Sequence, residues 1–349
     1  MKPKFLGVLL AVSCALTACG APQAPHAAEL TPSAILASST PGRMVLAISV
    51  DGLNPAALKS LGTRVPNYRR LLRQGASTLN ARTAYELTDT LPNHTGMMTG
   101  RPVASASGHR VTFNEDRPGS WLAKVAGHYL PGIFDGTHDR AMRTALYVSK
   151  VKFDFLDRSW NGTHGARDRV GTDNGRDKID LYVRTHEDTL ARRVVGDLVR
   201  APRPLVFWHI VNPDKAGHAH GFMSQHYLDA VRRTDRYLGT LLAAVDRHPW
   251  LRQRLTVILT SDHGGKGASH RDPTKYANYR IPFLAWGAGV KRGANLYALN
   301  PARLDPGTGR PTYAGRQPVR NTDVADLALT LLGVPPVVTF ANRKTIAVR

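Results

Sequence analysis

Cysteine is almost absent from this chain: its 349 residues include only Cys14 and Cys19, and both lie close to the N-terminus. A disulfide framework is therefore excluded as the main source of stability. Beyond the N-terminal segment we also find no apolar run that is long enough to span a membrane. The chain is long enough for one large domain, so we expect its stability to come from ordinary core packing.

The N-terminal segment has the features of a lipoprotein signal peptide. Basic residues precede an apolar stretch from Phe5 to about Leu16, and the stretch ends in Leu16-Thr17-Ala18-Cys19, which resembles a bacterial lipobox. This pattern predicts cleavage before Cys19, a membrane anchor of lipid on that residue, and a location in the bacterial cell envelope. An ordinary secretory signal with a chance cysteine is the alternative.

Acidic residues are scarce: there are 26, against 47 lysines and arginines, which gives a formal net charge of +21. Such a field attracts anions, including phosphate esters, nucleotides and acidic lipid head groups. We nevertheless favour the simpler interpretation, in which scattered arginines keep the surface soluble. No dense basic run with interleaved aromatic residues is present, so specific nucleic-acid binding is not expected.

Three short runs rich in Val, Ile and Leu are each followed by an aspartate. The runs and their aspartates are 44–50 with Asp51, 205–211 with Asp214, and 255–260 with Asp262. Runs of this kind are typical of buried parallel strands, and the ligand crevice of an open α/β sheet lies outside the carboxyl ends of its strands. We therefore predict an α/β fold with a mostly parallel central sheet, helices on both faces and a small loop-rich cap.

This interpretation divides the chain into three parts. Residues 1–18 are the predicted signal peptide, and residues 19–43, rich in Ala, Pro and Ser, are a predicted flexible tether. Residues 44–349 are the predicted α/β domain. Its segment from about 115 to 185 is expected to be partly a cap or insert, because much of it is polar and Gly-rich.

Histidines follow two of the three aspartates closely: His218 comes four residues after Asp214, and Asp262 is followed at once by His263 and then by His270. Carboxylates that converge at one sheet edge repel one another unless cations lie between them. Carboxylate with imidazole suits zinc, manganese or iron better than calcium. A turn or helix-capping role is the alternative for each aspartate alone, but the joint pattern predicts a metal site.

One threonine lies just before a predicted helix. Pro92 suits the first position of a helix, which would put Thr90 just before the N-terminus. A threonine hydroxyl becomes a competent nucleophile when a metal binds its alkoxide and a helix N-terminus assists. Two ions about 4 Å apart can stabilise both the attacking and the leaving oxygen of a phosphoryl displacement. A plain N-cap hydroxyl is the alternative.

Together these motifs resemble the alkaline phosphatase superfamily, and within it the nucleotide pyrophosphatase/phosphodiesterase-like branch. The resemblance covers most of the chain after the tether. The motifs that carry it are Ser49-Val50-Asp51-Gly52, Thr90-Leu91-Pro92-Asn93-His94, Asp214 to Gly221, and Ser261-Asp262-His263-Gly264-Gly265. The resemblance implies two divalent metal ions, with zinc favoured. One would be held by Asp51, Asp262, His263 and the Thr90 oxygen, and the other by Asp214, His218 and one more histidine.

The last ligand departs from the family pattern. In better-known members it lies much further downstream, but no histidine follows His270 here, so His270 is the candidate. Asn114 resembles the asparagine that binds a non-bridging phosphate oxygen in this branch, and a turn asparagine is an equal alternative. Other polar residues near these motifs are interpreted as loop histidines or solvated charges: His94, His109, His220, Lys150 and Lys152.

The resemblance implies a metal-dependent hydrolase of phosphodiester or pyrophosphate bonds that uses Thr90 as its nucleophile, with a small phosphate ester or a nucleotide as substrate. A phosphomonoesterase is the runner-up. A sulfatase is disfavoured, because threonine cannot be converted to the formylglycine of that branch. A non-catalytic binding lipoprotein of the envelope is the alternative from another class. The oligomeric state stays open.

Overall fold

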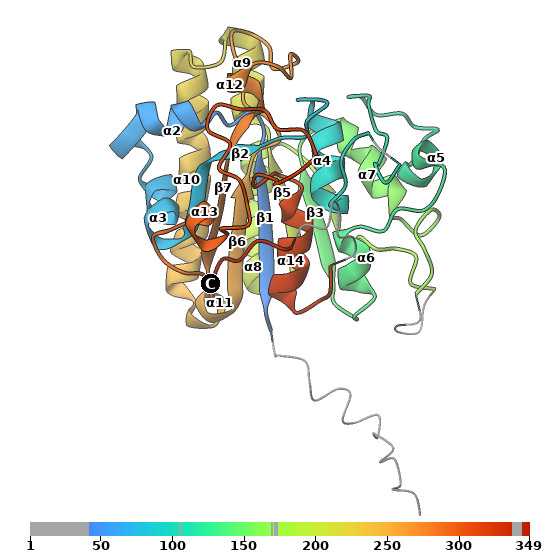
Figure 1. Ribbon diagram of the computed structural model, residues 1–349. Coiled ribbons are helices and arrows are strands. Elements are labelled where there is room, and N and C mark those ends of the chain that lie inside the picture. Colours follow the sequence, from blue (N-terminus) through green and yellow to red (C-terminus); the bar gives the residue numbers. More distant parts are fainter. Residues whose placement is uncertain (1–41, 105, 169, 171–173, 337–343) are drawn as a thin grey trace, which may run out of the picture. The chain divides into compact units, whose positions relative to one another are not determined.

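An eight-stranded sheet runs through the described part of the chain (Figure 1). The structure is a computed structural model that describes residues 42–349 except 105, 169, 171–173 and 337–343. The predicted signal peptide, Cys19 and nearly all of the predicted tether lie outside the described residues. The strands are β1 (Met44–Val50), β2 (Ala76–Arg82), β3 (Thr144–Val148), β4 (Tyr182–Arg184), β5 (Leu205–Ile210), β6 (Leu255–Thr260), β7 (Arg280–Gly287) and β8 (Ala294–Asn295).

The strand order is β4-β3-β5-β1-β6-β7-β2-β8. From β4 to β6 all neighbours are parallel, whereas β7 is antiparallel to both β6 and β2. The prediction of a mostly parallel sheet is therefore confirmed. The three runs that precede the aspartates form β5, β1 and β6, which are direct neighbours. Every residue of these three strands is buried, as expected for strands covered on both faces.

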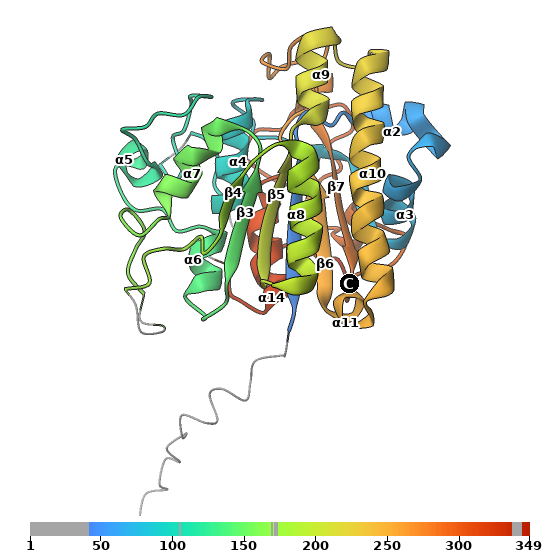
Figure 2. The same ribbon diagram turned by 180° about the vertical axis from the view of Figure 1, so that it is seen from behind.

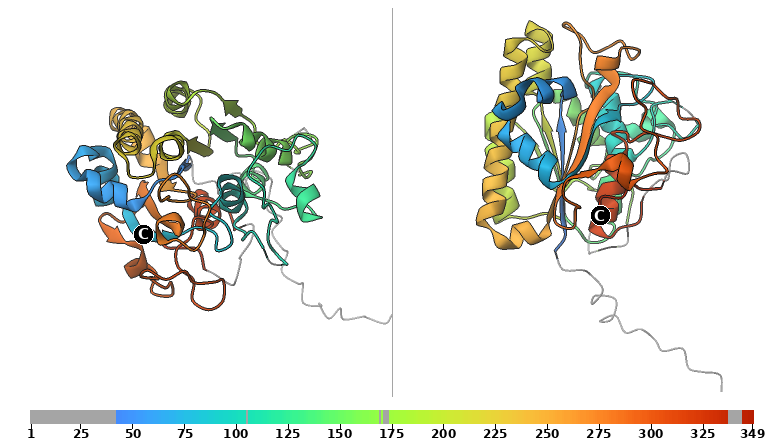
Figure 3. Two further views of the ribbon diagram at one scale, coloured as in Figure 1. Left: turned by 90° about the horizontal axis from the view of Figure 1, so that it is seen from above. Right: turned by 60° about the vertical axis from the view of Figure 1, so that its left-hand side comes forward.

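Helices cover both faces of the sheet (Figures 1 and 2). On one face lie α4 (Thr90–Thr99), α6 (Ile133–His138) and α14 (Asp323–Leu332), and on the other lie α3 (Pro66–Gln74), α8 (Glu187–Arg200) and α10 (Gln225–Arg247). The right-hand panel of Figure 3 shows the sheet between these layers. The remaining helices are α2 (Pro55–Leu61), α5 (Leu122–Ala126), α7 (Asp154–Ser159), α9 (Asn212–His220), α11 (Pro249–Arg254), α12 (Tyr276–Tyr279), α13 (Leu296–Leu299), and the 3-10 helices η1 (Gly62–Arg64) and η2 (Val151–Phe153).

Each face of the sheet has its own hydrophobic core, and alternate residues of β1 point into the two cores. Val45 and Ala47 belong to the core that includes α14, while Leu46 and Ile48 belong to the core that includes α10. This alternation follows from the pleat of a strand. It fixes the strand from both sides, so the residue that follows it, Asp51, is held at a defined place on the sheet edge.

One predicted helix boundary is wrong. Helix α4 begins at Thr90 and not at Pro92, because the amide of Asn93 already donates to the carbonyl of Asp89, 3.2 Å away. Pro92 lies within the first turn, where backbone N–H groups have no intrahelical partner and a proline is tolerated. Thr90 is therefore the first residue of the helix rather than the residue before it.

The segment from 115 to 185 is not separate from the sheet. It contributes β3 and β4 to it, and α5, α6 and α7 lie beside that edge (Figure 1). Trp160, in this segment, is completely buried. Within the described residues, none of the helices combines the length and the apolar character that crossing a membrane requires.

Candidate active site

The carboxyl ends of β5, β1 and β6 bring the predicted acidic ligands together. Asp51 follows β1 directly, Asp262 lies two residues after the end of β6, and Asp214 lies in the first turn of α9. Asp51 and Asp262 are fully buried, and Asp214 is 3% exposed. The strand order places Asp51 between the other two, because β1 lies between β5 and β6.

Several potential ligand atoms in this cluster have no hydrogen-bond partner among the described residues: Asp51 Oδ1, Asp214 Oδ1, Asp262 Oδ2 and His263 Nε2. His263 Nε2 lies 3.3 Å from Asp51 Oδ1 and 3.3 Å from Asp262 Oδ2. Buried polar atoms normally have partners, and a buried carboxylate is costly without one. Oxygen and nitrogen atoms that converge in this way fit a divalent cation.

A second set of ligand atoms lies beside the first. His218 Nε2 is 3.3 Å from Asp214 Oδ1, and His270 Nε2 is 3.7 Å from that oxygen and 3.1 Å from His218 Nε2. The structure therefore brings His270 to the other two residues, although it lies in a different loop. Asp214, His218 and His270 are close enough together to hold one ion.

Backbone carbonyls orient the three histidines. Nδ1 of His263, His218 and His270 lies 2.8, 3.0 and 2.6 Å from the carbonyl oxygens of Gly264, Ala268 and Thr88, respectively. A carbonyl can only accept, so each Nδ1 carries the proton and donates it. Each Nε2 is then left for the site, and at His263 the carboxylates of Asp262 and Asp51 outweigh burial and raise the pKa to about 9, so a metal bound there would displace a proton. Fixing the ring in this way is the usual arrangement for a histidine that binds metal.

The charges in the cluster are only partly compensated. Burial and the nearby carboxylate of Asp51 raise the pKa of Asp262 to about 7. Burial also opposes ionisation of Asp51, but the Lys150 ammonium, with His209 and His263, outweighs it and holds the pKa of Asp51 well below its usual range. The raised pKa of Asp262 indicates that the positive charge present does not fully compensate three ionised carboxylates, so a bound cation would favour the ionised form of Asp262.

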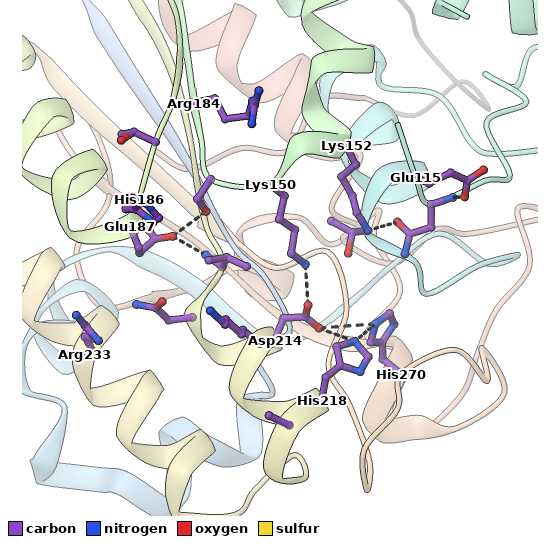
Figure 4. A pocket seen from close by; sticks show the side chains of 18 of the residues that line it. Glu115, Lys150, Lys152, Arg184, His186, Glu187, Asp214, His218, Arg233 and His270 are labelled. Carbon is purple, nitrogen blue, oxygen red and sulfur yellow. Dashed lines mark hydrogen bonds and ion pairs between the residues drawn. The ribbon is translucent and has the colours of Figure 1, made fainter. Parts of the chain in front are cut away.

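Thr90 and Asn114 lie on the wall of a cavity of about 1350 Å³ that also includes Asp214, His218 and His270 (Figure 4). The side chain of Asn114 is oriented by two donors to its Oδ1, the amide of Leu91 and Lys152 Nζ, each 2.9 Å away. Among the described residues, the hydrogen bond found for its Nδ2 is a long one of 3.4 Å to Asp89. The amide nitrogen of Asn114 is therefore able to donate to a ligand near Thr90.

The environment of Lys150 differs from what the sequence predicted. It was expected to be a solvated charge, but its Nζ lies 2.6 Å from Asp51 Oδ2 and 2.6 Å from Asp214 Oδ2. Burial alone would lower the pKa of Lys150, yet the two carboxylates outweigh burial and raise it above the usual value. The residue is buried because β3, which it follows, lies next to β5. Lys152 is likewise bonded to Asn114 rather than free in solvent.

The environments of the remaining histidines differ in detail from the expectation. His94 lies in α4 and not in a loop; it is fully buried, with Nδ1 2.7 Å from the carbonyl of Thr90. His109 is also fully buried, and burial lowers its pKa to about 3. His220 is exposed and stacks on His226. None of the clusters of potential metal ligands found among the described residues includes His94, His109 or His220.

Sequence reasoning missed two residues near the cluster. His209, in β5, is fully buried, and its Nε2 lies 2.9 Å from Asp51 Oδ2. A histidine within an otherwise apolar strand was the signal that could have pointed to it. Glu187 begins α8, and its Oε2 accepts from Ser149 Oγ and from the amide of Val211. Burial raises the pKa of Glu187 to about 7.

The rest of the cavity wall is polar and charged. Arg184, Lys215, Arg233 and Arg271 lie on it together with Glu115, Glu187 and Asp188. Arg233 pairs with Asp188, and Arg184 pairs with Asp154. Among the described residues that line the cavity, none is a phenylalanine, tyrosine or tryptophan. The cavity therefore offers charge and hydrogen bonds rather than large aromatic surfaces.

Comparisons with known proteins agree on a family. The family model for type I phosphodiesterase/nucleotide pyrophosphatase matches residues 45–117 and 123–307. Over 303 residues the chain is 26% identical to GPI ethanolamine phosphate transferase 1 of Mus musculus, which covers 77% of this chain and 32% of that protein. Over 258 residues it is 24% identical to ectonucleotide pyrophosphatase/phosphodiesterase family member 1 of Rattus norvegicus, which covers 70% of this chain and 25% of that protein.

Solved structures show the same fold. The structure of murine ectonucleotide pyrophosphatase/phosphodiesterase 5 aligns with a TM-score of 0.58 at 14% identity and covers 84% of this chain and 96% of that chain. The chain spans about a third or less of the length of the curated relatives described above. The family model nevertheless matches well over half of the present chain, in the part that contains the cluster. The chain belongs to the type I phosphodiesterase/nucleotide pyrophosphatase family, a branch of the alkaline phosphatase superfamily.

Proposed function

We propose that this chain is a metal-dependent hydrolase of phosphodiester or pyrophosphate bonds, with Thr90 as nucleophile and a centre of two divalent ions, preferably zinc. The observation that carries the proposal is the set of buried ligand atoms that have no hydrogen-bond partner among the described residues, one of which belongs to Asp214, a residue that lines the same cavity as Thr90. Asp51, Asp262 and His263, with the Thr90 oxygen, would hold one ion. The other would be held by Asp214, His218 and His270. When bound, the ions would lower the pKa of the attacking oxygen and neutralise charge on the phosphoryl group.

The side chains of the chain itself position the substrate and the nucleophile. The Thr90 hydroxyl lies at the N-terminus of α4, where the helix dipole favours negative charge on the oxygen. Thr90 Oγ1 attacks phosphorus, the bond to the leaving oxygen breaks, and a phosphothreonine forms. Asn114 Nδ2 donates to a non-bridging phosphoryl oxygen as charge develops there. Water then attacks phosphorus, and the bond to Thr90 Oγ1 breaks to release phosphate or a phosphate monoester.

The cavity favours a diester over a monoester. Its volume of about 1350 Å³ is more than one phosphate group requires, and its wall continues from Thr90 to Arg184 and Arg233. A second substituent on phosphorus could lie along this wall. The absence of large aromatic side chains among the described lining residues favours a polar substituent over a nucleobase, which proteins commonly bind by stacking.

Transfer of a phosphoryl-linked head group to an alcohol is the second candidate. Relatives named GPI ethanolamine phosphate transferase 1 match up to 84% of the chain. Transfer and hydrolysis share the first step and differ only in whether an alcohol or water attacks the phosphothreonine.

Activity assays with and without a chelator test the proposal. We expect the purified chain to hydrolyse bis-p-nitrophenyl phosphate faster than p-nitrophenyl phosphate, and we expect a chelator to abolish both activities until zinc is restored. Phosphorus NMR in the presence of glycerol would separate hydrolysis from transfer, because transfer gives a new diester. Full activity after complete removal of metal would contradict the proposed centre.

We further propose that the chain acts at the bacterial cell envelope, held there by lipid on Cys19. The lipobox-like string supports this proposal. The non-catalytic alternative is disfavoured, because every expected ligand position carries a residue that can bind metal.

A further inference from the structure

Lys150 approaches the cluster from outside the three strands that carry the acidic ligands. It follows β3 and precedes η2, and its side chain is mostly buried, with an exposed fraction of 19%. In Figure 4 its stem runs down from the end of β3 to the carboxylate of Asp214. A lysine in this place puts a fixed positive charge at a site whose other nearby groups are carboxylates and imidazoles.

The ammonium joins the two sets of ligands. Its Nζ lies 2.6 Å from Oδ2 of Asp51, which belongs to one set, and 2.6 Å from Oδ2 of Asp214, which belongs to the other. The second oxygen of each carboxylate, Oδ1, has no hydrogen-bond partner among the described residues. Both Oδ1 atoms are on the side of His263, at 3.3 and 3.9 Å from its Nε2.

We propose that Lys150 is a built-in counter-cation: it binds one oxygen of each carboxylate, leaves the other oxygen for metal, and keeps the site folded before metal is bound. Oδ2 of each carboxylate binds Lys150, and Oδ1 of each carboxylate stays available for metal. An ammonium on Oδ2 does not block Oδ1, so Lys150 can stay in place when ions bind. His209 Nε2, 2.9 Å from Asp51 Oδ2, adds a second donor on the same side.

The physical reason is the charge of the site without metal. Two buried carboxylates that lose a cationic partner are strongly destabilising, whereas the same carboxylates paired with an ammonium are tolerated. A flexible four-carbon stem lets one ammonium reach both side chains. The contacts of Lys150 therefore predict a metal-free protein that keeps its fold, ready to bind ions after export.

A neighbouring lysine provides a matched control. Lys152 lies two residues further on, in η2, and is also partly buried. Its Nζ donates to the neutral oxygen of Asn114, 2.9 Å away, and no ion pair with a carboxylate is found for it among the described residues. Loss of Lys152 removes a similar stem and a similar charge but leaves Asp51 and Asp214 paired.

Thermal unfolding of the full chain after chelator treatment tests the proposal. We expect Lys150→Met to lower the midpoint temperature by on the order of 5–10 °C, and Lys152→Met to lower it by less than about 2 °C. The midpoint temperature of Lys150→Arg should recover at least half of the loss seen in Lys150→Met, because arginine restores the positive charge but has a different shape from lysine. Equal midpoints for wild type and Lys150→Met under chelator would overturn the proposal. If Lys150→Met is insoluble, Lys150→Arg decides: a soluble arginine variant supports the proposal, and an insoluble one contradicts it.

A zinc titration of the same proteins provides the second measurement. Because Lys150 and the ions share the same carboxylates, removal of the lysine should increase the zinc-induced rise in midpoint temperature relative to wild type. An equal or smaller rise in Lys150→Met would contradict the claim that Lys150 substitutes for metal charge. The zinc titration rests on the proposed metal centre. If wild type binds no zinc at all, the proposed function fails, but the chelator experiment still tests the contact of Lys150 with Asp51 and Asp214.

Discussion

At the scale of single residues, the hydroxyl of Thr90 has one proposed task, so its removal should affect catalysis far more than folding. We expect Thr90→Ala to keep its fold and nearly all of its metal while hydrolysis falls by about a thousandfold or more. Activity and metal content would be measured on the same preparation. Thr95→Ala is the control, because Thr95 is buried in the same helix and only bonds the carbonyl of Leu91. Turnover like wild type in the Thr90 variant would refute the nucleophile assignment.

His270 is the ligand for which the chain departs from better-known relatives. If it binds metal, His270→Ala should reduce the ratio of metal to protein from about two to about one, because the Asp51, Asp262 and His263 set stays complete. Elemental analysis after dialysis measures this ratio. His220→Ala, which changes an exposed histidine of α9, should keep both ions. A ratio near two with unchanged activity in His270→Ala would show that the ion is held otherwise.

Glu187 should make stability depend on pH. Its pKa of about 7 in the folded state lies above the value of 4.5 for a free side chain, so the folded state holds the proton more tightly. This contribution to the free energy of unfolding is complete below pH 4.5 and is lost as the pH rises to 7. Raising the pH from 5 to 8 should therefore lower the midpoint temperature of wild type by roughly 5 °C more than that of Glu187→Gln.

The control for this prediction is Glu115→Gln. Glu115 lies on the same cavity but is exposed, and its hydrogen bond with Arg117 lowers its pKa rather than raising it. Its substitution should leave the difference between pH 5 and pH 8 as in wild type. The same pH dependence in Glu187→Gln and wild type would show that Glu187 is ionised in the folded protein throughout this range.

The residues that the sequence could predict are those that follow a local pattern. Asp51, Asp214 and Asp262 each come just after an apolar run, and the end of a buried strand is a recognisable place. The contacts of Lys150 and His209 with Asp51 could not be predicted in this way, although a histidine in an apolar strand was a signal for His209 itself. Their roles depend on the order of strands, which puts β3 beside β5 and β5 beside β1, and no local pattern encodes that order.

At the scale of elements, the ring of Phe222 holds two ligand-bearing segments together. A Cβ added to Gly265, after β6, would lie 2.3 Å from the ring, and one added to Gly217, in α9, would lie 2.7 Å from it. Both positions therefore need glycine for close approach. His218 and Asp214 belong to one of these segments, and His263 and Asp262 belong to the other.

This packing predicts a coupling between two substitutions. Gly265→Ala should destabilise the protein by about 2 kcal/mol, because overpacking a filled core costs about 1–3 kcal/mol. Phe222→Leu in the same chain should recover at least half of this loss by making room for the new methyl group. Chemical denaturation of the two single variants and the double variant measures the coupling. Strictly additive losses would show that the ring and the glycine do not constrain each other.

The sequence predicted the type of most elements better than their limits and order. Long periodic helices such as α10 have their ends marked by Ser224, which caps the N-terminus, and by the change of pattern before Pro249. The start of α4 was misplaced because Pro92 was taken as the helix start, although proline is tolerated throughout the first turn. The antiparallel direction of β7 was not predicted, since an apolar run looks the same in both directions.

At the scale of the whole molecule, we propose that the N-terminus determines where the chain is located. Cys19→Ser should prevent lipid attachment, so we expect the variant in the soluble fraction or as an uncleaved precursor. Membrane fractionation and mass spectrometry of the mature N-terminus measure the outcome, with Cys14→Ser as the control because that residue would be removed with the signal. An unacylated mature chain that starts at any residue other than Cys19 would contradict the anchor.

The acidic ligands follow three adjacent strands, β5, β1 and β6, and the spacing of these strands bears on the dimensions of the site. Neighbouring strands in any sheet lie about 4.8 Å apart, which is close to the separation of about 4 Å in two-metal centres. The spacing of the strands would therefore contribute to the distance between the two proposed ion positions, together with α9 and the loop that carries His270. Loops such as those between residues 115 and 185 can change what enters the cavity without altering that distance. Substrate range can diverge in this architecture while the reacting centre keeps its dimensions.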